Sequence, residues 1–399
     1  MKKNLKECEK GKILMKIGIV WHAKYPLDIR IAKEIKSLLK RGHKVVMISR
    51  NNKRQTAKEN FPGTLIYRFP YFGTSLINTF LSIPLPINIF WFVWVRYLVK
   101  RENIKLLIAR DLPLAFPTIV VGKLQNIPVI FDMAENYPAA LEAWRRQGKY
   151  VAKVLEKICV HLANHIIVVA EENAERLRKI NVAFAKITIV KNTPEMNFFQ
   201  DFSTDTGCND KKKFILLYTG FLECHRGLEI CIRAMPLILK ENSDIEFLII
   251  GKGKSENSLK KLAEKLKVRT NIIFCGWVNF ERIPGIIRRS NVCLIPHLIS
   301  GHTNTTLPNK LFDYMACGKP IVSSRLKPVE RILINENCGI VVKNNSPEEF
   351  TNAILCLYDN TKLCRKLGEN GRKAFLRKYN WEIDGKTFVD CVEMFCPKK

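Results

Sequence analysis

The sequence lacks the patterns that define several classes of protein. Its 13 cysteines are odd in number, scattered and without a Cys-x-x-Cys pair, which disfavours a disulfide framework or a zinc site and favours a reducing compartment. It has no low-complexity tract and no repeat at solenoid spacing. The first 20 residues carry charges and only a short apolar run, so we expect no signal peptide.

Acidic residues are scarce relative to basic ones. The chain has 37 Asp and Glu against 66 Lys and Arg, which gives a formal net charge of +29. Such a charge attracts an anionic partner, either nucleic acid, a phospholipid surface or a phosphorylated substrate, unless it is only a solvated lysine surface. No aromatic RNA-binding motif, zinc-finger spacing or helix-turn-helix accompanies the charge, so we expect no specific nucleic-acid partner.

What the chain does contain is a repeated alternation of short apolar strands and amphipathic helices. Continuous apolar strands are typical of parallel sheets covered on both faces. Because 399 residues exceed one ordinary core, the sequence predicts an α/β protein of two doubly wound, Rossmann-like domains facing each other across a cleft. We expect domains at 1–200 and 201–380, and a last helical segment at 381–399 that crosses back to the first domain.

One segment, 75–100, departs from this alternation. It is apolar and aromatic, is interrupted by two prolines and ends in basic residues, but its uninterrupted part is short for a bilayer span. One interpretation is a helix in the membrane interface, with Trp91 and Trp94 at headgroup level and basic residues on anionic lipid. The other is a buried helix of the first domain. The basic residues concerned are Arg96, Lys100 and Arg101.

Three strand-to-helix turns in the second half carry candidate ligand-binding residues. Gly220 ends a strand, and Arg226 stands just before the next helix, where backbone N–H groups and a guanidinium suit a phosphate. Gly251 and Gly253 form a second turn, but the third glycine of a dinucleotide loop is absent and no Walker lysine pattern occurs.

The third turn is "TLPNKLFDYMACGKPIVSS", residues 306–324. It predicts a helix that begins near Asn309, with Lys310 in its first turn and Asp313 one turn later on the same side. Backbone N–H groups and Lys310 suit a diphosphate, and the Asp313 carboxylate suits the two hydroxyls of a ribose. Together they describe a site for a nucleoside diphosphate.

In order and close to their spacing, these stretches resemble family 4 glycosyltransferases with the GT-B fold. The resemblance rests on "YTGFLECHRGLEICIRAM", "LIIGKGKSENSLKKLAEKL", "IIFCGWVNFERIPGIIRRSNVCLIPH" and the turn at 306–324. In the first half, "WHAKYPLDIRIAKEIKSLLKRGHKVVMIS" and "IARDLPLAFPTIVVGKLQNIPVIFDMAENYP" are similar to the acceptor domain of that family, more diffusely.

The resemblance implies a retaining transferase that uses neither metal nor cofactor, in agreement with the absence of an Asp-x-Asp motif. By position, Asp313 would hold the ribose, and Arg226 and Lys310 would stabilise the departing diphosphate. Trp277 and Val278 lie where the base docks. The remaining donor contacts would come from the turn glycines and the loop before the helix: Gly220, Gly251, Gly253, Thr305, Thr306, Leu307 and Asn309.

Two positions depart from the family pattern. Many members have a second acid that precedes the one at Asp313 with seven residues between them, and that place holds Thr305, for which a backbone N–H or a hydroxyl of Thr305 or Thr306 would substitute. The arginine of the family's Gly-Arg-Leu stretch is Phe221 here, which leaves Arg226 as the arginine of that loop.

On the acceptor side, Asp132 and Glu135 are candidates to orient the acceptor hydroxyl or take its proton. Weaker acceptor-binding candidates from the same half are His22, Asp28, Arg30, Arg110 and Asp111. His22 and His302, which precedes the donor loop, are each more typical of a structural hydrogen-bonding residue than of a catalytic one.

The sequence therefore predicts a cytoplasmic glycosyltransferase, peripheral on the inner face of the cell membrane. It would move a hexosyl or N-acetylhexosaminyl group from a nucleoside diphosphate sugar, UDP favoured over GDP, to a glycan or polyprenyl-phosphate-linked acceptor in cell-surface glycan synthesis. An anionic membrane surface would give the charge a purpose. Two alternatives stay open: a nucleotide-sugar 2-epimerase and a non-catalytic nucleotide-sugar-binding protein.

Overall fold

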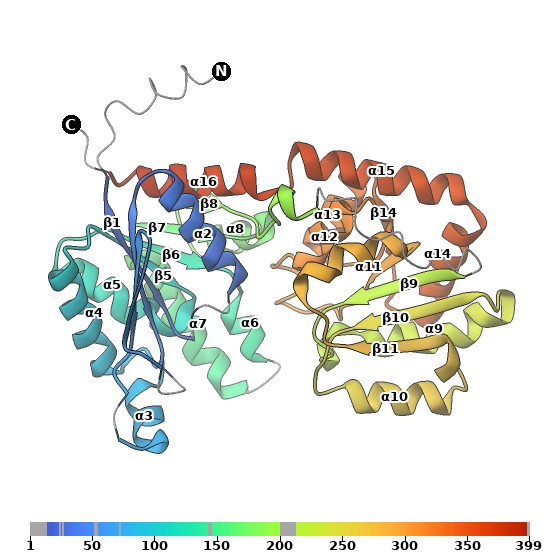
Figure 1. The fold of residues 1–399 in the computed structure, drawn as a ribbon, viewed down its shortest axis with the longest axis horizontal. Helices are drawn as coiled ribbons and strands as arrows, with labels where there is room; N and C mark the ends of the chain where they lie inside the picture. Colours follow the sequence, from blue (N-terminus) through green and yellow to red (C-terminus); the bar gives the residue numbers. More distant parts are fainter. Residues whose placement is uncertain are drawn as a thin grey trace. The chain divides into compact units, whose positions relative to one another are not determined.

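The computed structural model describes residues 14–23, 25, 28–51, 55–71, 73–142, 146–199 and 213–396. The chain forms two compact units, Met1–Val190 with Asp384–Lys399, and Lys191–Ile383 (Figure 1). The predicted boundary at 200 and 201 falls in 200–212, outside the described residues, and the division comes earlier, after Val190.

The first unit is built on an eight-stranded sheet. Its order is β3-β4-β2-β1-β5-β6-β7-β8, parallel except for the antiparallel pair of β3 and β4 at one edge. Chain order reverses between β1 and β5, which is where ligands bind in open α/β sheets. The strands are β1 (Lys16–Trp21), β2 (Lys44–Ser49), β3 (Lys58–Phe61), β4 (Thr64–Arg68), β5 (Leu106–Arg110), β6 (Val129–Met133), β7 (His165–Val168) and β8 (Ile187–Ile189).

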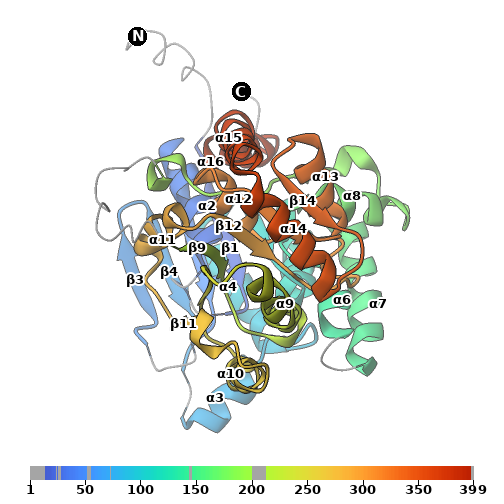
Figure 2. The same ribbon diagram turned by 90° about the vertical axis from the view of Figure 1, so that its right-hand side faces the viewer.

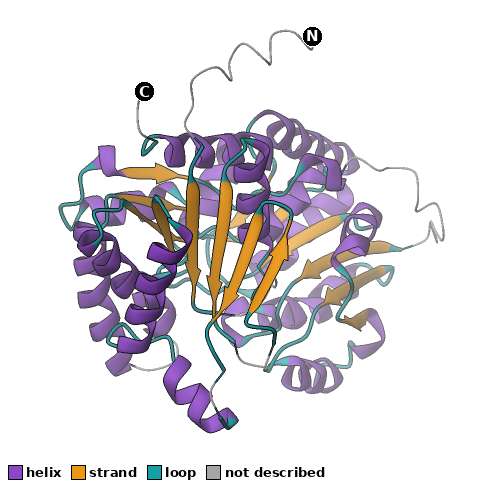
Figure 3. Cartoon of the chain, turned by 60° about the vertical axis from the view of Figure 1, so that its left-hand side comes forward, coloured by secondary structure: helices purple, strands orange, loops and turns teal. Residues whose placement is uncertain are grey.

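Helices cover both faces of this sheet, as continuous burial along β5 and β6 requires (Figure 3). Helices α4, α5 and α7 pack side by side, while α16 contacts the end of α2 through Arg41, which pairs with Asp390 and Glu393. The helices are α2 (Ile29–Lys40), α3 (Ser75–Ser82), α4 (Ile89–Glu102), α5 (Ala115–Leu124), α6 (Tyr137–Glu142), α7 (Arg146–Leu162), α8 (Glu171–Arg178) and α16 (Trp381–Glu393), with short 3-10 turns at Leu112–Leu114 and Phe184–Lys186.

The second unit is built on a six-stranded, all-parallel sheet of order β11-β10-β9-β12-β13-β14. Its chain order reverses between β9 and β12. The strands are β9 (Phe214–Thr219), β10 (Ile245–Ile250), β11 (Ile272–Gly276), β12 (Val292–Ile295), β13 (Ile321–Ser324) and β14 (Gly339–Val342). The helices are α9 (Leu228–Glu241), α10 (Glu256–Lys265), α11 (Ile283–Arg289), α12 (Asn309–Ala316), α13 (Lys327–Asn335), α14 (Pro347–Asp359) and α15 (Thr361–Arg377), with short 3-10 turns at Met196–Phe199, Cys224–Arg226, Arg269–Asn271 and Phe280–Arg282. Two doubly wound sheets confirm the predicted fold class.

The segment 75–100 folds as two helices, α3 and α4, joined by the proline-containing turn. Trp91 is 0% exposed, packs on Phe69 with ring centroids 4.8 Å apart, and donates its indole N–H to the Ser82 carbonyl. Of the two interpretations of this segment, the buried helix therefore holds for Trp91, whose ring is part of the core and does not lie at headgroup level. Trp94 is half-buried and stacks on Tyr97. Within the described residues, no helix combines the length and apolar character needed to span a bilayer.

Candidate functional site

In the second unit, the candidate donor residues gather at the point where chain order reverses. Gly220 follows β9 and has φ +129°, a conformation that favours glycine. A Cβ on Gly220 would lie 3.0 Å from the Lys310 Nζ, and a Cβ on Gly227 would lie 1.9 Å from the Pro296 carbonyl oxygen, so both turns need glycine. The Thr219 N–H donates to the Tyr314 hydroxyl, which ties β9 to α12.

Lys310 lies in the first turn of α12 and is 9% exposed. Its ammonium stands 3.5 Å from the centroid of the Tyr218 ring, and it finds no hydrogen-bond acceptor among the described residues. Burial, and next the charge of Arg226, lower the pKa of Lys310 well below its ordinary value of 10.5, against the opposing charge of Asp313. A buried ammonium that lacks acceptors is suited to receiving an anion.

Arg226 completes the positive cluster from the turn before α9. Its Nη1 lies 3.5 Å from the His297 Nε2, and its buried Nε has no partner in the described chain. Burial, followed by the charges of Lys310 and Arg226, lowers the pKa of His297 well below 6.5, so this imidazole is neutral. The first N–H groups of α12 are also without intrahelical partners, because every helix leaves them so. The arrangement can bind a phosphate or diphosphate.

The loop before α12 is held by its own hydrogen bonds. The Thr305 N–H donates to the His302 carbonyl, and the Thr305 hydroxyl donates to the carbonyls of Gly301 and His302. The Thr306 hydroxyl donates to the His302 carbonyl as well. These hydrogen bonds hold the loop in shape. Because the N–H and the hydroxyl of Thr305 already donate to carbonyls of the loop, they conflict with the prediction that Thr305 donates to the donor sugar in place of the missing acid.

The other predicted donor residues lie in the glycine turn after β10, beside the exposed ring of Trp277, and on or just before α12. Gly251 and Gly253 allow close backbone packing, since a Cβ on each would lie 1.9 Å from the Gly220 oxygen and 2.3 Å from the Leu222 oxygen. The rings of Phe221 and Trp277 are exposed, with centroids 6.0 Å apart and planes tilted by 41°, and they offer an apolar surface beside β9 and β11. Val278 and Asp313 are half-buried, and Leu307 is buried. Asn309 is exposed, and its side-chain oxygen accepts a hydrogen bond from the Asn192 Nδ2 at 3.0 Å.

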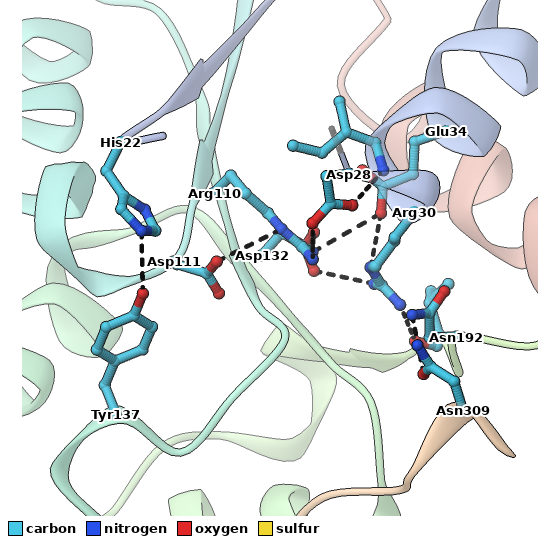
Figure 4. Close-up of polar contacts among 12 residues, drawn as sticks. His22, Asp28, Arg30, Glu34, Arg110, Asp111, Asp132, Tyr137, Asn192 and Asn309 are labelled. Atoms are coloured by element: carbon cyan, nitrogen blue, oxygen red, sulfur yellow. Dashed lines mark hydrogen bonds and ion pairs between the residues drawn. The ribbon is translucent and has the colours of Figure 1, made fainter. Parts of the chain in front are cut away.

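In the first unit, a network of buried charges lies at the carboxyl ends of β5 and β6 (Figure 4). Asp132 is 0% exposed; Arg30 Nη2 donates to its Oδ1 at 3.0 Å, and Arg110 donates to its Oδ2. Burial opposes ionisation of Asp132, but the charges of Arg110 and Arg30 outweigh it and lower its pKa. Arg30 also donates to the Val190 carbonyl and pairs with Glu34 at 2.8 Å.

This geometry corrects the prediction that Asp132 contacts the acceptor hydroxyl. Both of its oxygens are bound by guanidinium groups and its pKa is lowered, so it is a poor proton acceptor. Arg30 is likewise enclosed, and Asp28 caps α2 by accepting from the Ile31 N–H at 2.9 Å. Asp132 and Arg30 therefore organise the sheet end instead of lining its surface, whereas the Asp28 side chain stays 26% exposed while it caps α2.

Asp111 follows β5 in a strained conformation. Its φ of 61° and ψ of 166° belong to a region that is essentially reserved for glycine, and such strain clusters at functional sites. Its Oδ1 is buried without a partner in the described part of the chain, and its Oδ2 lies 3.7 Å from the Arg110 Nε. Burial raises the pKa of Asp111 to about 7, with Arg110 opposing and Glu135 adding to the rise.

Around Asp111 lie His22, Tyr137 and Glu135. The His22 Nε2 is 3.3 Å from the Tyr137 hydroxyl (Figure 4). Burial, and next the charge of Arg110, lower the pKa of His22 to about 4, so its ring is neutral. Glu135 is exposed. The cluster thus offers a neutral hydrogen-bonding pair, a buried carboxyl and an exposed carboxylate.

The sequence reasoning missed Glu34, Tyr137, Tyr218 and His297. Only Glu34 had a sequence signal, its i,i+4 spacing from Arg30 on an amphipathic helix. The others are aromatic residues in or beside apolar strands and helices, and only their neighbours reveal their roles. Among the residues described, no group of three or more His, Cys, Asp or Glu is placed to hold a metal ion.

Comparison with family models covers most of the chain. Residues 201–374 match the model described as glycosyl transferases group 1, and residues 30–193 match the model described as glycosyltransferase family 4. The two matches correspond closely to the second and first units.

Individual relatives are more distant. An uncharacterized glycosyltransferase of Methanocaldococcus jannaschii is 27% identical over 60% of this chain and 61% of its own length. The UDP-Gal:alpha-D-GlcNAc-diphosphoundecaprenol alpha-1,3-galactosyltransferase of Escherichia coli is 21% identical over 71% of this chain and 73% of its own. The chain spans about half the length of the Methanocaldococcus relatives it matches, at 61%, 47% and 44%.

Solved structures share the whole fold. Sucrose-phosphate synthase from Thermosynechococcus elongatus superposes with a TM-score of 0.77 at 16% identity, over 95% of this chain and 98% of its own. Anabaena Alr3699/HepE in complex with UDP superposes with a TM-score of 0.72 at 10% identity, over 96% of this chain and 100% of its own. At such identities these likenesses establish the fold.

Proposed function

The chain belongs to the group 1 glycosyltransferases of family 4, and we propose that it transfers a sugar with retention of configuration from a nucleoside diphosphate sugar. UDP is favoured over GDP as the carrier, in keeping with the UDP bound by the Anabaena structure. The observation that carries the proposal is the pair Lys310 and Arg226, two cationic groups with unpartnered buried nitrogens where the sheet order reverses.

The chemistry of this pair follows from where charge develops. When the glycosidic bond to the diphosphate breaks, the leaving oxygen gains negative charge. Lys310 and Arg226 would lower the barrier because their attraction to that oxygen is stronger in the transition state than in the ground state. Both are held by the fold before the donor binds, so little reorganisation is needed. In this scheme fixed cations supply the charge stabilisation, and no metal or cofactor is invoked.

The rest of the donor would be held by neighbouring groups of the same unit. We assign the ribose hydroxyls to Asp313, one turn into α12. The base would stack near the exposed rings of Phe221 and Trp277, close to Val278. The N–H groups at the start of α12 would receive diphosphate oxygens.

On the acceptor side, we assign direct contact to Glu135 and Asp111, with His22 and Tyr137 orienting the hydroxyl. Asp111 suits a late proton acceptor, since a buried carboxyl with pKa about 7 holds a transferred proton near neutral pH. Asp132 would act indirectly, by fixing Arg110 beside Asp111.

A hexosyl or N-acetylhexosaminyl donor and a lipid-linked or saccharide acceptor complete the proposal. The Escherichia coli relative acts, by its name, on a diphosphoundecaprenol-linked sugar. A phosphate-bearing lipid acceptor, used in cell-surface glycan synthesis at the inner face of the membrane, would match the +29 charge of this chain.

The test is calorimetric titration of the protein with UDP and with GDP, followed by incubation with candidate UDP-sugars. We expect one diphosphate to bind and Arg226→Ala to weaken it, while Arg233→Ala, an exposed arginine on α9, leaves it unchanged. Conversion of donor alone to an epimer would instead identify a 2-epimerase. Binding without consumption of any nucleotide sugar, with any acceptor extract, would indicate a binding protein.

A further inference from the structure

The outer surface of α3 and the start of α4 exposes large apolar side chains in one continuous stretch of chain. Leu76 is 82% exposed, Phe80 is 76% exposed and Ile87 is 88% exposed. Helix α4 buries Trp91, Val95 and Leu98 in the core of the first unit, so α4 is anchored there while the apolar side chains on its outer side and on α3 remain exposed. The other exposed apolar residues here are Ile77, Ile83, Leu85, Ile89, Phe90, Val93 and Tyr97.

The charge around this surface has one sign. The sequence contains no Asp or Glu from Gly73 to Arg101. Arg96, Lys100 and Arg101 are exposed on α4, with Arg101 bonded to the Tyr97 hydroxyl. Exposed apolar side chains flanked by Lys and Arg, without Asp or Glu, are typical of segments that lie in the interface of an anionic bilayer.

Helix α7 repeats the pattern independently. Tyr150, Val151, Val154 and Ile158 are exposed along its outer side. Lys153 and Lys157 lie among them and are also exposed, whereas Glu156, the one acid of α7, is buried against Arg176. In Figures 1 and 2, α3 and the start of α7 project toward the same end of the first unit.

We propose that the first unit docks on an anionic phospholipid bilayer through a two-part surface, formed by the outer sides of α3–α4 and of α7. Phe80, Leu76 and their apolar neighbours enter the headgroup boundary, and the surrounding Lys and Arg side chains contact lipid phosphates. The inference rests on the proposed function, which supplies the lipid-linked acceptor. It deepens that function by naming the surface that brings the first unit to the lipid.

A second copy of the chain is the competing occupant, and charge argues against it. Two copies joined face to face would bring Arg96, Lys100 and Arg101 of each together without an intervening acid, which is repulsive. An anionic bilayer supplies the opposite charge.

The experiment is co-sedimentation of the full chain with vesicles of phosphatidylcholine, with and without phosphatidylglycerol. We expect binding to the phosphatidylglycerol vesicles only, reduced at high salt. The double variant Leu76→Asp/Phe80→Asp should bind at least about tenfold more weakly, because each change removes an inserting group and adds repulsion. Val151→Asp/Val154→Asp should also weaken binding. The matched control, Ile334→Asp/Leu376→Asp, changes equally apolar exposed residues of the second unit and should bind like the parent.

Titration of the same samples with UDP and with GDP separates the two proposals, and circular dichroism checks that each variant is folded. If the parent ignores phosphatidylglycerol vesicles, or the α3 variant binds them equally well, the docking surface is refuted, whatever UDP does. If vesicles bind but neither diphosphate does, the docking surface stands and the proposed function fails. If the parent is a dimer that Leu76→Asp/Phe80→Asp dissociates, and no vesicle binds, the surface is an interface between copies.

Discussion

Replacing Lys310 by methionine is expected to stabilise the empty protein while weakening its donor binding. The side chain of Lys310 is nine-tenths buried, its ammonium has no hydrogen-bond acceptor among the described residues, and its compensation there comes from the Tyr218 ring at 3.5 Å and the charge of Asp313. Burying an ion costs several kcal/mol, whereas a desolvated cation–π contact returns about 2 kcal/mol. Methionine has a similar shape and needs no partner, so Lys310→Met should raise the free energy of unfolding by about 1–3 kcal/mol.

The pH dependence of this gain has a defined sign. The folded-state pKa of Lys310 lies well below 10.5, so between the two values the unfolded chain holds a proton that the folded chain has lost. The stability of the parent therefore rises with pH across that window, and the advantage of Lys310→Met shrinks there.

Diphosphate binding should move in the opposite direction. A hydrogen bond from a charged donor contributes about 1.5–3 kcal/mol, so Lys310→Met should raise the Kd roughly 10- to 150-fold. Denaturant unfolding at two pH values and calorimetric titration measure both effects, with Lys366→Met on the exposed side of α15 as the control. If the variant is less stable than the parent, or binds the diphosphate equally well, Lys310 is not a destabilising buried ammonium that binds the diphosphate.

Three further predictions follow from single observations. Diphosphate binding should take up protons between the lowered pKa of Lys310 and 10.5, because the anion restores its charge; titrations in two buffers of different ionisation enthalpy measure the uptake, and none in that window contradicts the burial argument. Asp111→Gly should stabilise the protein by about 1 kcal/mol, since relieving strain of about 1–3 kcal/mol exceeds the flexibility cost of glycine, and should lower transfer; a loss of stability in denaturant unfolding would remove the strain argument. Trp91→Ala should cost about 3–5 kcal/mol and Phe80→Ala at most about 0.5 kcal/mol in the same unfolding assay, and the reverse order would place the wrong ring in the core.

The fold class and part of the candidate site could be predicted from local sequence patterns. The alternation of apolar strands and amphipathic helices determined two doubly wound sheets, because each strand must be buried on both faces. The positions of Arg226 and Lys310 were also indicated by sequence, since residues just after parallel strands collect at one edge of a sheet. Both inferences use spacing along the chain and nothing more.

Other features were decided only when distant segments came together. Asp132 and Glu135 looked alike in sequence, but Arg30, 102 positions from Asp132, encloses the first and leaves the second exposed. Within the segment 75–100, composition did not distinguish Trp91 from Phe80; packing on Phe69 buried the Trp91 ring, whereas the Phe80 side chain remained 76% exposed. Burial and pKa depend on what surrounds a side chain in space, and those neighbours are supplied by tertiary contacts that no local pattern encodes.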